Sequence, residues 1–208
     1  MTLLYKLQHI KIITFIVSLL FIGCNDKSTT IKEIFNGFTS QPVNFLNKKA
    51  YIPSNYKKIN LNELGEMLKQ NPDLNKLDKM NYRLATSSYN QSGKTPVLYQ
   101  DSIVNTNSIW FLPGSYVPLN KSMVNDFVNA AEKQFLIPAQ YQGINYKRLE
   151  AKFIKLNALK AIKVKYKLIF NDNIRYLTQY IITKQLETYS MIVTHEYNED
   201  FQKVLKSL

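Results

Sequence analysis

The sequence predicts an α+β domain in which an antiparallel sheet is flanked by helices as an α/β/α sandwich, preceded by a cleaved lipoprotein signal peptide. Three observations predict it. Apolar and polar residues alternate with a period of two through much of the last third of the chain, two earlier segments repeat apolar residues every three or four positions, and an apolar run stands near the start. Alternation is typical of half-buried strands and the longer step of amphipathic helices. Successive strands flanked by helices indicate an α+β layer architecture.

Residues 1–23 have the features of a secretory signal peptide. Lys6 and Lys11 precede the apolar run "IITFIVSLLFI", which is shorter than the roughly 20 residues of a spanning helix. The "FIGC" that follows resembles the lipobox of bacterial lipoproteins, with Phe21 where that family usually has leucine. The resemblance implies cleavage before Cys24 and attachment there of diacylglycerol and an acyl chain such as palmitate. The alternative is an uncleaved anchor with an incidental cysteine.

Cysteine content and charge bound the function further. Cys24 is the only cysteine, so lipidation would use the single thiol and leave the mature domain without disulfides or thiol chemistry. The formal charge is +12, and the leader contributes two of these positive charges. A basic domain favours anionic partners such as lipid headgroups or acidic proteins. Export and the lack of a nucleic-acid motif argue against nucleic acid.

Residues 24–42 are mostly polar and are predicted to form a flexible tether, with a single domain over 43–208. Asn60 and Glu63 have capping-box spacing before the apolar stripe Leu61, Leu64 and Leu68, which predicts a helix that Pro72 ends. Strands are expected around 82–89, 96–104 and 108–112, separated by loops rich in Asn, Ser and Gly.

A second helix is expected after Asn120. One face of it carries apolar residues at helical spacing, and Pro138 is expected to close it. These residues are Met123, Val124, Phe127, Val128, Ala131 and Phe135. Four strands then follow near 146–156, 161–170, "IRYLTQYIITK" and "TYSMIVTHE", with "NAL", "NDN" and "QLE" as turns. The chain closes with a helix in which Asn198 caps the start and Phe201, Val204, Leu205 and Leu208 form the buried stripe.

This order of elements resembles the PsbP-like fold over roughly 43–208. The segments that carry the resemblance are "YIPSNYKKI" and "YSMIVTHEYNEDFQKVLKSL". Members of that family are mostly binding or assembly modules, including envelope lipoproteins, and share no catalytic residues. The resemblance therefore implies a non-catalytic protein-binding or assembly module.

No motif assigns a catalytic residue, a metal site or a cofactor. "SGKT" lacks the earlier glycine and the following helix of a phosphate-binding loop. His195 in "HEYNED" is the only histidine after the leader, and one imidazole is a thin donor set for a metal. No nucleophile elbow occurs. We therefore expect no enzyme activity.

Two stretches are candidate interaction surfaces. Lys163, Lys165 and Lys167 share one face of a predicted strand, where they would bind phosphates or an acidic partner or merely solvate the outer side of a hairpin. Trp110, Phe111 and Tyr116 flank a Pro-Gly turn, where they would anchor an interface or belong to the core.

The first functional hypothesis is thus a lipid-anchored envelope protein that binds an unknown, acidic envelope protein. The alternatives are a carrier or sensor of a small ligand, with a pocket between sheet and helix, and a hydrolase with an unrecognised site. Asn25 replaces the aspartate that retains related lipoproteins at the inner membrane, and no acidic run follows. The resemblance therefore implies an outer-membrane lipoprotein that faces the periplasm.

Overall fold

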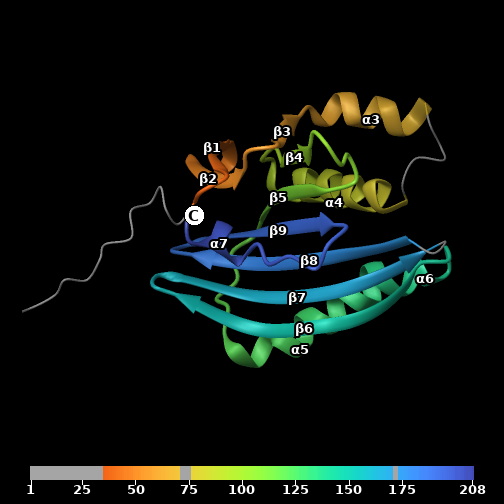
Figure 1. Cartoon of the computed structure of the whole chain (residues 1–208). Helices are drawn as coiled ribbons and strands as arrows, with labels where there is room; N and C mark the ends of the chain where they lie inside the picture. Colours follow the sequence, from red (N-terminus) through yellow and green to blue (C-terminus); the bar gives the residue numbers. More distant parts are fainter. Residues whose placement is uncertain (1–34, 71–75, 171–172) are drawn as a thin grey trace, which may run out of the picture. The chain divides into compact units, whose positions relative to one another are not determined.

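Seven strands of the chain form one antiparallel sheet in the order β3-β4-β5-β9-β8-β7-β6 (Figure 1). This computed structural model describes residues 35–208 apart from 71–75 and 171–172. The strands are β3 (Tyr56–Ile59), β4 (Val97–Asp101), β5 (Ser108–Gly114), β6 (Asn145–Leu156), β7 (Leu159–Phe170), β8 (Asn173–Lys184) and β9 (Glu187–His195). These strands belong to the unit Gly37–Leu208, in which helices pack on both faces of the sheet. The predicted α+β architecture is therefore confirmed.

The four long strands β6 to β9 confirm the prediction from alternation. They form a meander in which each strand pairs with its sequence neighbour. Asn157 and Gln185, in the turns after β6 and β8, adopt φ values of 50° and 57°, a left-handed conformation that Asn tolerates better than most residues. The "NDN" turn falls partly at 171–172, outside the described residues.

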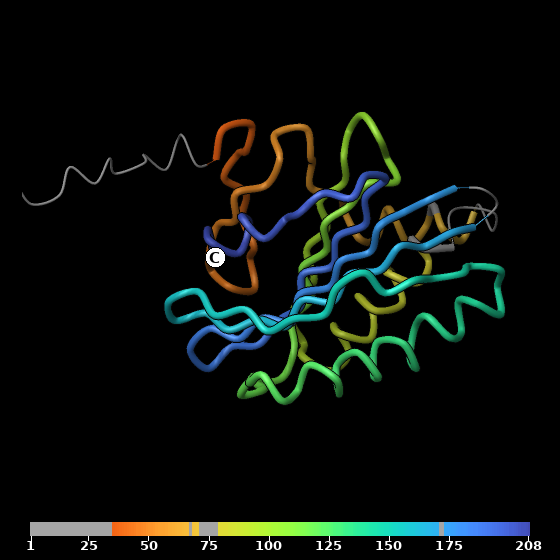
Figure 2. The backbone as a smooth tube through the Cα atoms, turned by 60° about the horizontal axis from the view of Figure 1, so that its bottom comes forward, coloured from red at the N-terminus to blue at the C-terminus, as the bar shows by residue number. Residues whose placement is uncertain are grey.

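The sheet separates two apolar clusters. One cluster contains Trp110, Val164 and Ile192 and packs under helices. The other contains Phe111, Tyr180 and Met191 and packs under the short helix α7 (Gln202–Leu205) and a separate hairpin. Figure 2 shows α4 (Lys76–Ser92) and the segment from α5 (Val124–Ala131) to α6 (Ile137–Gln140) on one side of the long strands and that hairpin on the other. Both faces of the central strands are therefore buried against other elements, except at the groove described below.

The N-terminal boundary of the folded unit differs from the prediction. The hairpin consists of β1 (Phe38–Val43) and β2 (Lys48–Pro53), which pair in antiparallel register. The predicted tether, 24–42, therefore already contains most of a strand, and the folded unit begins at Gly37. Val43, Ala50 and Ile52 are buried in the core beside α7, which is why so polar a segment is ordered.

The helix predicted after Asn60 is α3 (Leu61–Gln70), and Asn60 caps it by accepting a hydrogen bond from the Asn62 N–H at 2.9 Å. The next segment was predicted as a strand over 82–89, and this is wrong: it belongs to α4 (Lys76–Ser92). The buried face of α4 includes the polar residues Asn81 and Ser88, so its helical stripe is not visible as an apolar pattern. Gly65 allows α3 to approach α4, because a Cβ there would collide with the Tyr82 hydroxyl.

The helix after Asn120 runs further than predicted. It comprises η2 (Lys121–Met123), α5 (Val124–Ala131), the π-helical turn η3 (Glu132–Leu136) and α6 (Ile137–Gln140). The Asn120 side chain caps the start of this segment by accepting a hydrogen bond from the Ser122 N–H at 3.0 Å. Pro138 does not end the helix, because the wider turn before it accommodates the residue that cannot donate a backbone hydrogen bond.

The closing helix is α7, and its predicted apolar stripe is buried. Asn198 is not its cap: the N-cap position is Phe201, and the Gln202 N–H in the first turn donates to Asp200 Oδ1 at 2.8 Å. The Ser207 hydroxyl oxygen accepts from the Tyr51 N–H at 2.9 Å. The C-terminal segment is thus fixed to β2 and to the sheet.

Candidate functional site

A groove lies on the helical side of the sheet because the helices are anchored to different strands. The helix α4 lies on β5, α5 lies on β6 and β7, and α6 lies on β6. Asn81 of α4 donates to Thr194 Oγ1 at 3.3 Å, and the Ser88 hydroxyl donates to the Pro113 carbonyl. In the order β5-β9-β8-β7, the strands left between the two helical segments are β9 and β8. The middle of these two strands therefore forms the floor of the groove.

Four side chains form the floor, two from β8 and two from β9, and on each strand one is polar and the other is apolar. On paired strands, Gln179 is opposite Ile192 and Ile181 is opposite Ser190. Gln179, Ile181 and Ser190 are only partly buried, whereas Tyr180, Ile182 and Met191 on the other face of the same strands are fully buried. The exposure is therefore confined to the middle of this face, since Leu177, Thr183 and Thr188 nearer its ends are buried.

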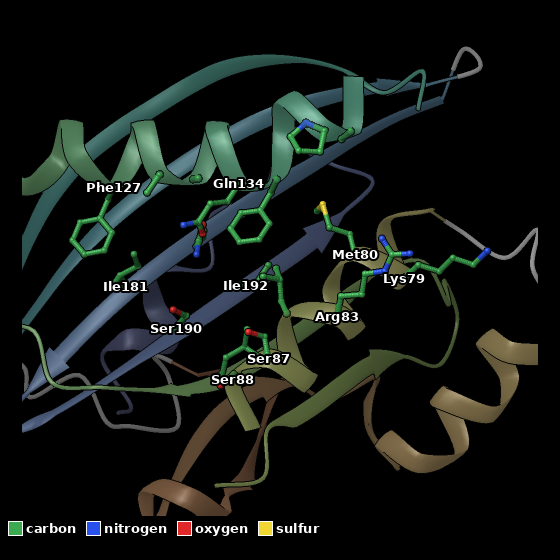
Figure 3. Close-up of a pocket in the computed structure, with 18 of the residues that line it drawn as sticks. Lys79, Met80, Arg83, Ser87, Ser88, Phe127, Gln134, Ile181, Ser190 and Ile192 are labelled. Atoms are coloured by element: carbon green, nitrogen blue, oxygen red, sulfur yellow. The ribbon is translucent and has the colours of Figure 1, made fainter. Parts of the chain in front are cut away.

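The walls come from the two helical segments (Figure 3). Met80, Leu84 and Ser87 of α4 stand on one side, and Phe127 and Gln134 of the other segment stand opposite. The groove encloses about 850 Å³, which is within the roughly 300–1,000 Å³ of ligand-binding sites in proteins. The π-helical turn widens the helix where Gln134 lies. Such turns occur often at functional sites.

The charged side chains of the groove are both positive and lie at one end of it. Lys79 and Arg83 lie together beyond Met80, at the end of the groove away from Phe127 and Ile181 (Figure 3). None of the described side chains that line the groove is acidic. Arg83 is exposed and forms no ion pair within the described part of the chain. The arrangement offers apolar contact, amide and hydroxyl hydrogen bonds, and positive charge at one end.

The lysine row does not form an exposed surface, which corrects one reading of the sequence. Lys163 is 2% exposed. Its ammonium group lies 2.6 Å from Glu150 Oε2 and 3.1 Å from Asp200 Oδ2. The Tyr180 hydroxyl donates to Asp200 Oδ1 at 3.0 Å. The C-terminal segment covers this face of β7 and brings Asp200 to the lysine.

The other two lysines have different environments. Lys165 is 5% exposed, and its ammonium donates to the Glu199 carbonyl at 2.7 Å. Burial, and next the charge of Lys163, lower the pKa of Lys165. Lys167 is partly exposed. Only Lys167 of the three is therefore placed to contact a partner.

The aromatic residues near the Pro-Gly turn are also divided. Trp110 is 1% exposed and faces the helices, while Phe111 is fully buried on the opposite face against Tyr99. Both belong to the core, so their use as an interaction surface is excluded. Tyr116 lies after β5 and is 50% exposed, so it alone of these three is accessible.

His195 has a structural environment at the end of β9. Its Nδ1 accepts from the Tyr197 N–H at 3.0 Å, and its ring packs against Phe201. Glu199 Oε2 lies 4.0 Å from His195 Nε2. In the described part of the chain, no three His, Cys, Asp or Glu side chains are grouped closely enough to hold a metal ion.

The groove itself was missed by reasoning from the sequence, apart from the general expectation of a pocket between sheet and helix. Phe127 was identified only as part of a buried stripe, and α4 was misread as a strand. One signal was available: Gln179 lies between Leu177 and Ile181 on one face of β8, and it pairs with Ile192 next to Ser190 on β9. Their significance depends on which helix covers which strand, and the sequence does not state this.

The predicted lipid attachment lies outside the described residues, because the predicted signal peptide and Cys24 precede residue 35. Among the residues that the structure describes, no helix is long and apolar enough to cross a bilayer.

No protein-family model matches the chain, and no curated protein matches it. Among solved structures, it is similar to the solution structure of cyanobacterial PsbP (CyanoP) from Synechocystis sp. PCC 6803. The sequence identity is 10% and the TM-score is 0.49, with 82% of this chain and 91% of that chain covered. That protein belongs to the family that the sequence resembles. A likeness this distant carries no information on function, and the fold stands on the strand order given above.

Proposed function

We propose that this protein is a non-catalytic binding module of the bacterial cell envelope and that the groove between α4 and the α5–α6 segment binds its partner protein. The observation that carries the proposal is the floor of the groove: two central strands keep Gln179, Ile181 and Ser190 partly exposed, while their other face is fully buried. Floor positions left partly uncovered between two fixed helices, one apolar and two polar, provide a preformed binding site.

The chemistry of the lining supports binding over catalysis. Its polar groups are amides, hydroxyls and two cations, and Ser88 already donates to the Pro113 carbonyl. Hydrolytic chemistry uses a base or a second carboxylate within hydrogen-bond reach of the nucleophile. The side chains that supply such groups, His195 and the acids around Lys163, lie outside the groove lining.

The same proposal places the protein at the outer membrane, held by lipid on Cys24 and facing the periplasm. The support is the signal peptide and the lipobox resemblance, together with Asn25 after the cysteine. The described structure begins with a turn at Phe35, so 10 residues separate it from Cys24. A chain of that length can reach at most about 35 Å. The domain could therefore reach a partner near the membrane surface.

Site-specific crosslinking in intact cells tests the groove as the binding site. A photoreactive benzoylphenylalanine at Ser87, in the groove wall, should give an adduct with a partner protein. The same residue at Thr86, exposed on the same helix but outside the lining, is the matched control. Blocking the floor by Ser190→Trp should remove the adduct at position 87.

The outcomes are decisive in both directions. An adduct at 87 alone, lost on blocking the floor, supports the proposal. Equal adducts at 86 and 87, or an adduct that survives Ser190→Trp in a folded protein, would refute it. Ile181→Trp fills the same floor from the neighbouring strand and serves if Ser190→Trp does not fold.

A further inference from the structure

We infer that the groove binds an extended acidic peptide segment of the partner, with a carboxylate at Arg83 and an apolar side chain beside Phe127 and Ile181. This inference rests on the proposed function, since it names the chemistry that the same groove recognises. Three features of the groove lead to it: its charge, the pattern of its floor and the position of its floor strands within the sheet.

Charge determines one end of the segment. Arg83 is exposed, forms no ion pair within the described residues, and lies next to Lys79 (Figure 3). The described lining contains no carboxylate that pairs with Arg83. A guanidinium group pairs with a carboxylate through two parallel hydrogen bonds, a geometry that confers specificity as well as affinity. The occupant is therefore expected to be acidic at this end.

The floor favours a peptide over a hydrocarbon chain. A hydrocarbon lying over Gln179 and Ser190 would displace water from their polar groups and leave them unpaired, which opposes binding. Gln134 of the facing wall would lose its water in the same way. A peptide backbone carries an N–H donor and a C=O acceptor at nearly every residue and can pair with all three side chains.

The spacing of the floor also matches an extended chain. Gln179 and Ile181 are two residues apart on β8, as are Ser190 and Ile192 on β9. Two residues of a strand span roughly 6.6 Å, which is also the repeat of alternate side chains in an extended peptide. A peptide lying along the strands would therefore meet polar and apolar positions at the period of its own side chains.

The floor strands cannot add the peptide as a new strand. Both β8 and β9 are inside the sheet, and each is hydrogen-bonded on its two sides. The peptide must therefore lie on top of the sheet, along these strands, and bond to side chains instead of to a free backbone edge. Amide and hydroxyl side chains at Gln134, Gln179 and Ser190 supply that need. The mode differs from the strand addition by which many proteins bind extended peptides.

A selection from a phage-displayed library of random peptides tests the inference, using the full-length protein in detergent. We expect wild type to enrich sequences with Asp or Glu several residues from a large apolar residue. Arg83→Glu should shift the enriched charge toward Lys and Arg. Lys57→Glu on β3 is the matched control, because this exposed cation lies outside the groove. A synthetic wild-type-selected peptide should bind Arg83→Glu about tenfold to a hundredfold more weakly by fluorescence polarisation.

The outcomes separate the inference from the proposed function. If Ser190→Trp blocks peptide binding while Arg83→Glu leaves the charge preference unchanged, the groove remains the site and the acidic assignment is wrong. If no acidic peptide is enriched and a fluorescent fatty acid binds in a manner that Ser190→Trp prevents, the occupant is a lipid and the inference is overturned. If Ser190→Trp leaves peptide binding intact in a folded protein, the groove itself is the wrong site.

Discussion

In the buried ion cluster around Lys163, we expect loss of the two acids to lower the stability of the protein more than loss of the lysine does. Lys163 is 2% exposed, whereas the side chains of Glu150 and Asp200 are 31% and 53% exposed. An ion that is left buried without a partner costs several kcal/mol, while one that reaches water costs little. Removing the acids should therefore be more damaging than removing the lysine.

The magnitudes follow from the remaining contacts. In Lys163→Met, Glu150 keeps Lys152 at 2.6 Å and Asp200 keeps the Gln202 N–H at 2.8 Å. We expect a loss of about 1–2 kcal/mol in the free energy of unfolding. In the double variant Glu150→Gln, Asp200→Asn, the ammonium group stays buried without a counter-ion. That loss should be about 3–5 kcal/mol, which corresponds to roughly 10 °C in melting temperature for a domain of this size.

Urea unfolding followed by fluorescence provides the assay, since Trp110 is the only tryptophan and is buried. A triple variant that adds Lys163→Met to the two amides is the control. It removes the unpaired ammonium and should be more stable than the double variant, with an unchanged dependence on urea. If the triple variant is the less stable one, or if the lysine substitution alone costs more than the two acid substitutions together, the reasoning is refuted.

Three further predictions concern pH, the buried strand and the lipid. Burial acts to raise the pKa values of Asp200 and Glu150, but hydrogen bonds and nearby lysines outweigh it, so both pKa values lie below the ordinary range. The stability that these carboxylates give is thus present above about pH 4 and is lost as the pH falls through their folded pKa values. In the double amide variant, the free energy of unfolding should therefore change less with pH over this range. Val164→Asp should lower the free energy of unfolding by several kcal/mol, measured by thermal denaturation, because Val164 is 3% exposed. Lys160→Asp, at an exposed position of the same strand, should change the stability little. Equal losses of stability in the two variants would contradict the burial of this face. Cys24→Ser should abolish metabolic labelling with a fatty-acid analogue, and label that persists in the variant would exclude lipidation at this residue.

Much of the fold could be predicted from the sequence because the relevant signals are local. The alternation "AIKVKYKLIF" depends only on the two-residue repeat of a strand, and it located β7 within two residues at its start and correctly at its end. Asn60 and Asn120 cap helices through hydrogen bonds to residues two positions away. Such patterns hold whatever the rest of the chain does.

Local patterns failed where polar residues occupy buried positions. In α4, Asn81 and Ser88 face the sheet and bond to Thr194 and the Pro113 carbonyl, residues more than 20 positions away. Without the partners, the same segment reads as polar with scattered apolar residues. The strand predicted there was wrong for that reason. The prediction that Pro138 ends the helix was wrong for a related reason. A proline normally ends a helix, and the π-helical turn before it is not visible in the sequence.

The sequence by itself determined the alternating strands, the capped helices, the single cysteine and the positive charge. Only the tertiary structure decided what covers each face. The C-terminal segment covers the lysine row and converts an apparent basic surface into a buried ion cluster, and the helices leave β8 and β9 open as a groove. The physical reason is that burial is a relation between segments far apart in the chain: Asp200 is 37 residues from Lys163, and no local repeat records which of two faces a distant segment will occupy.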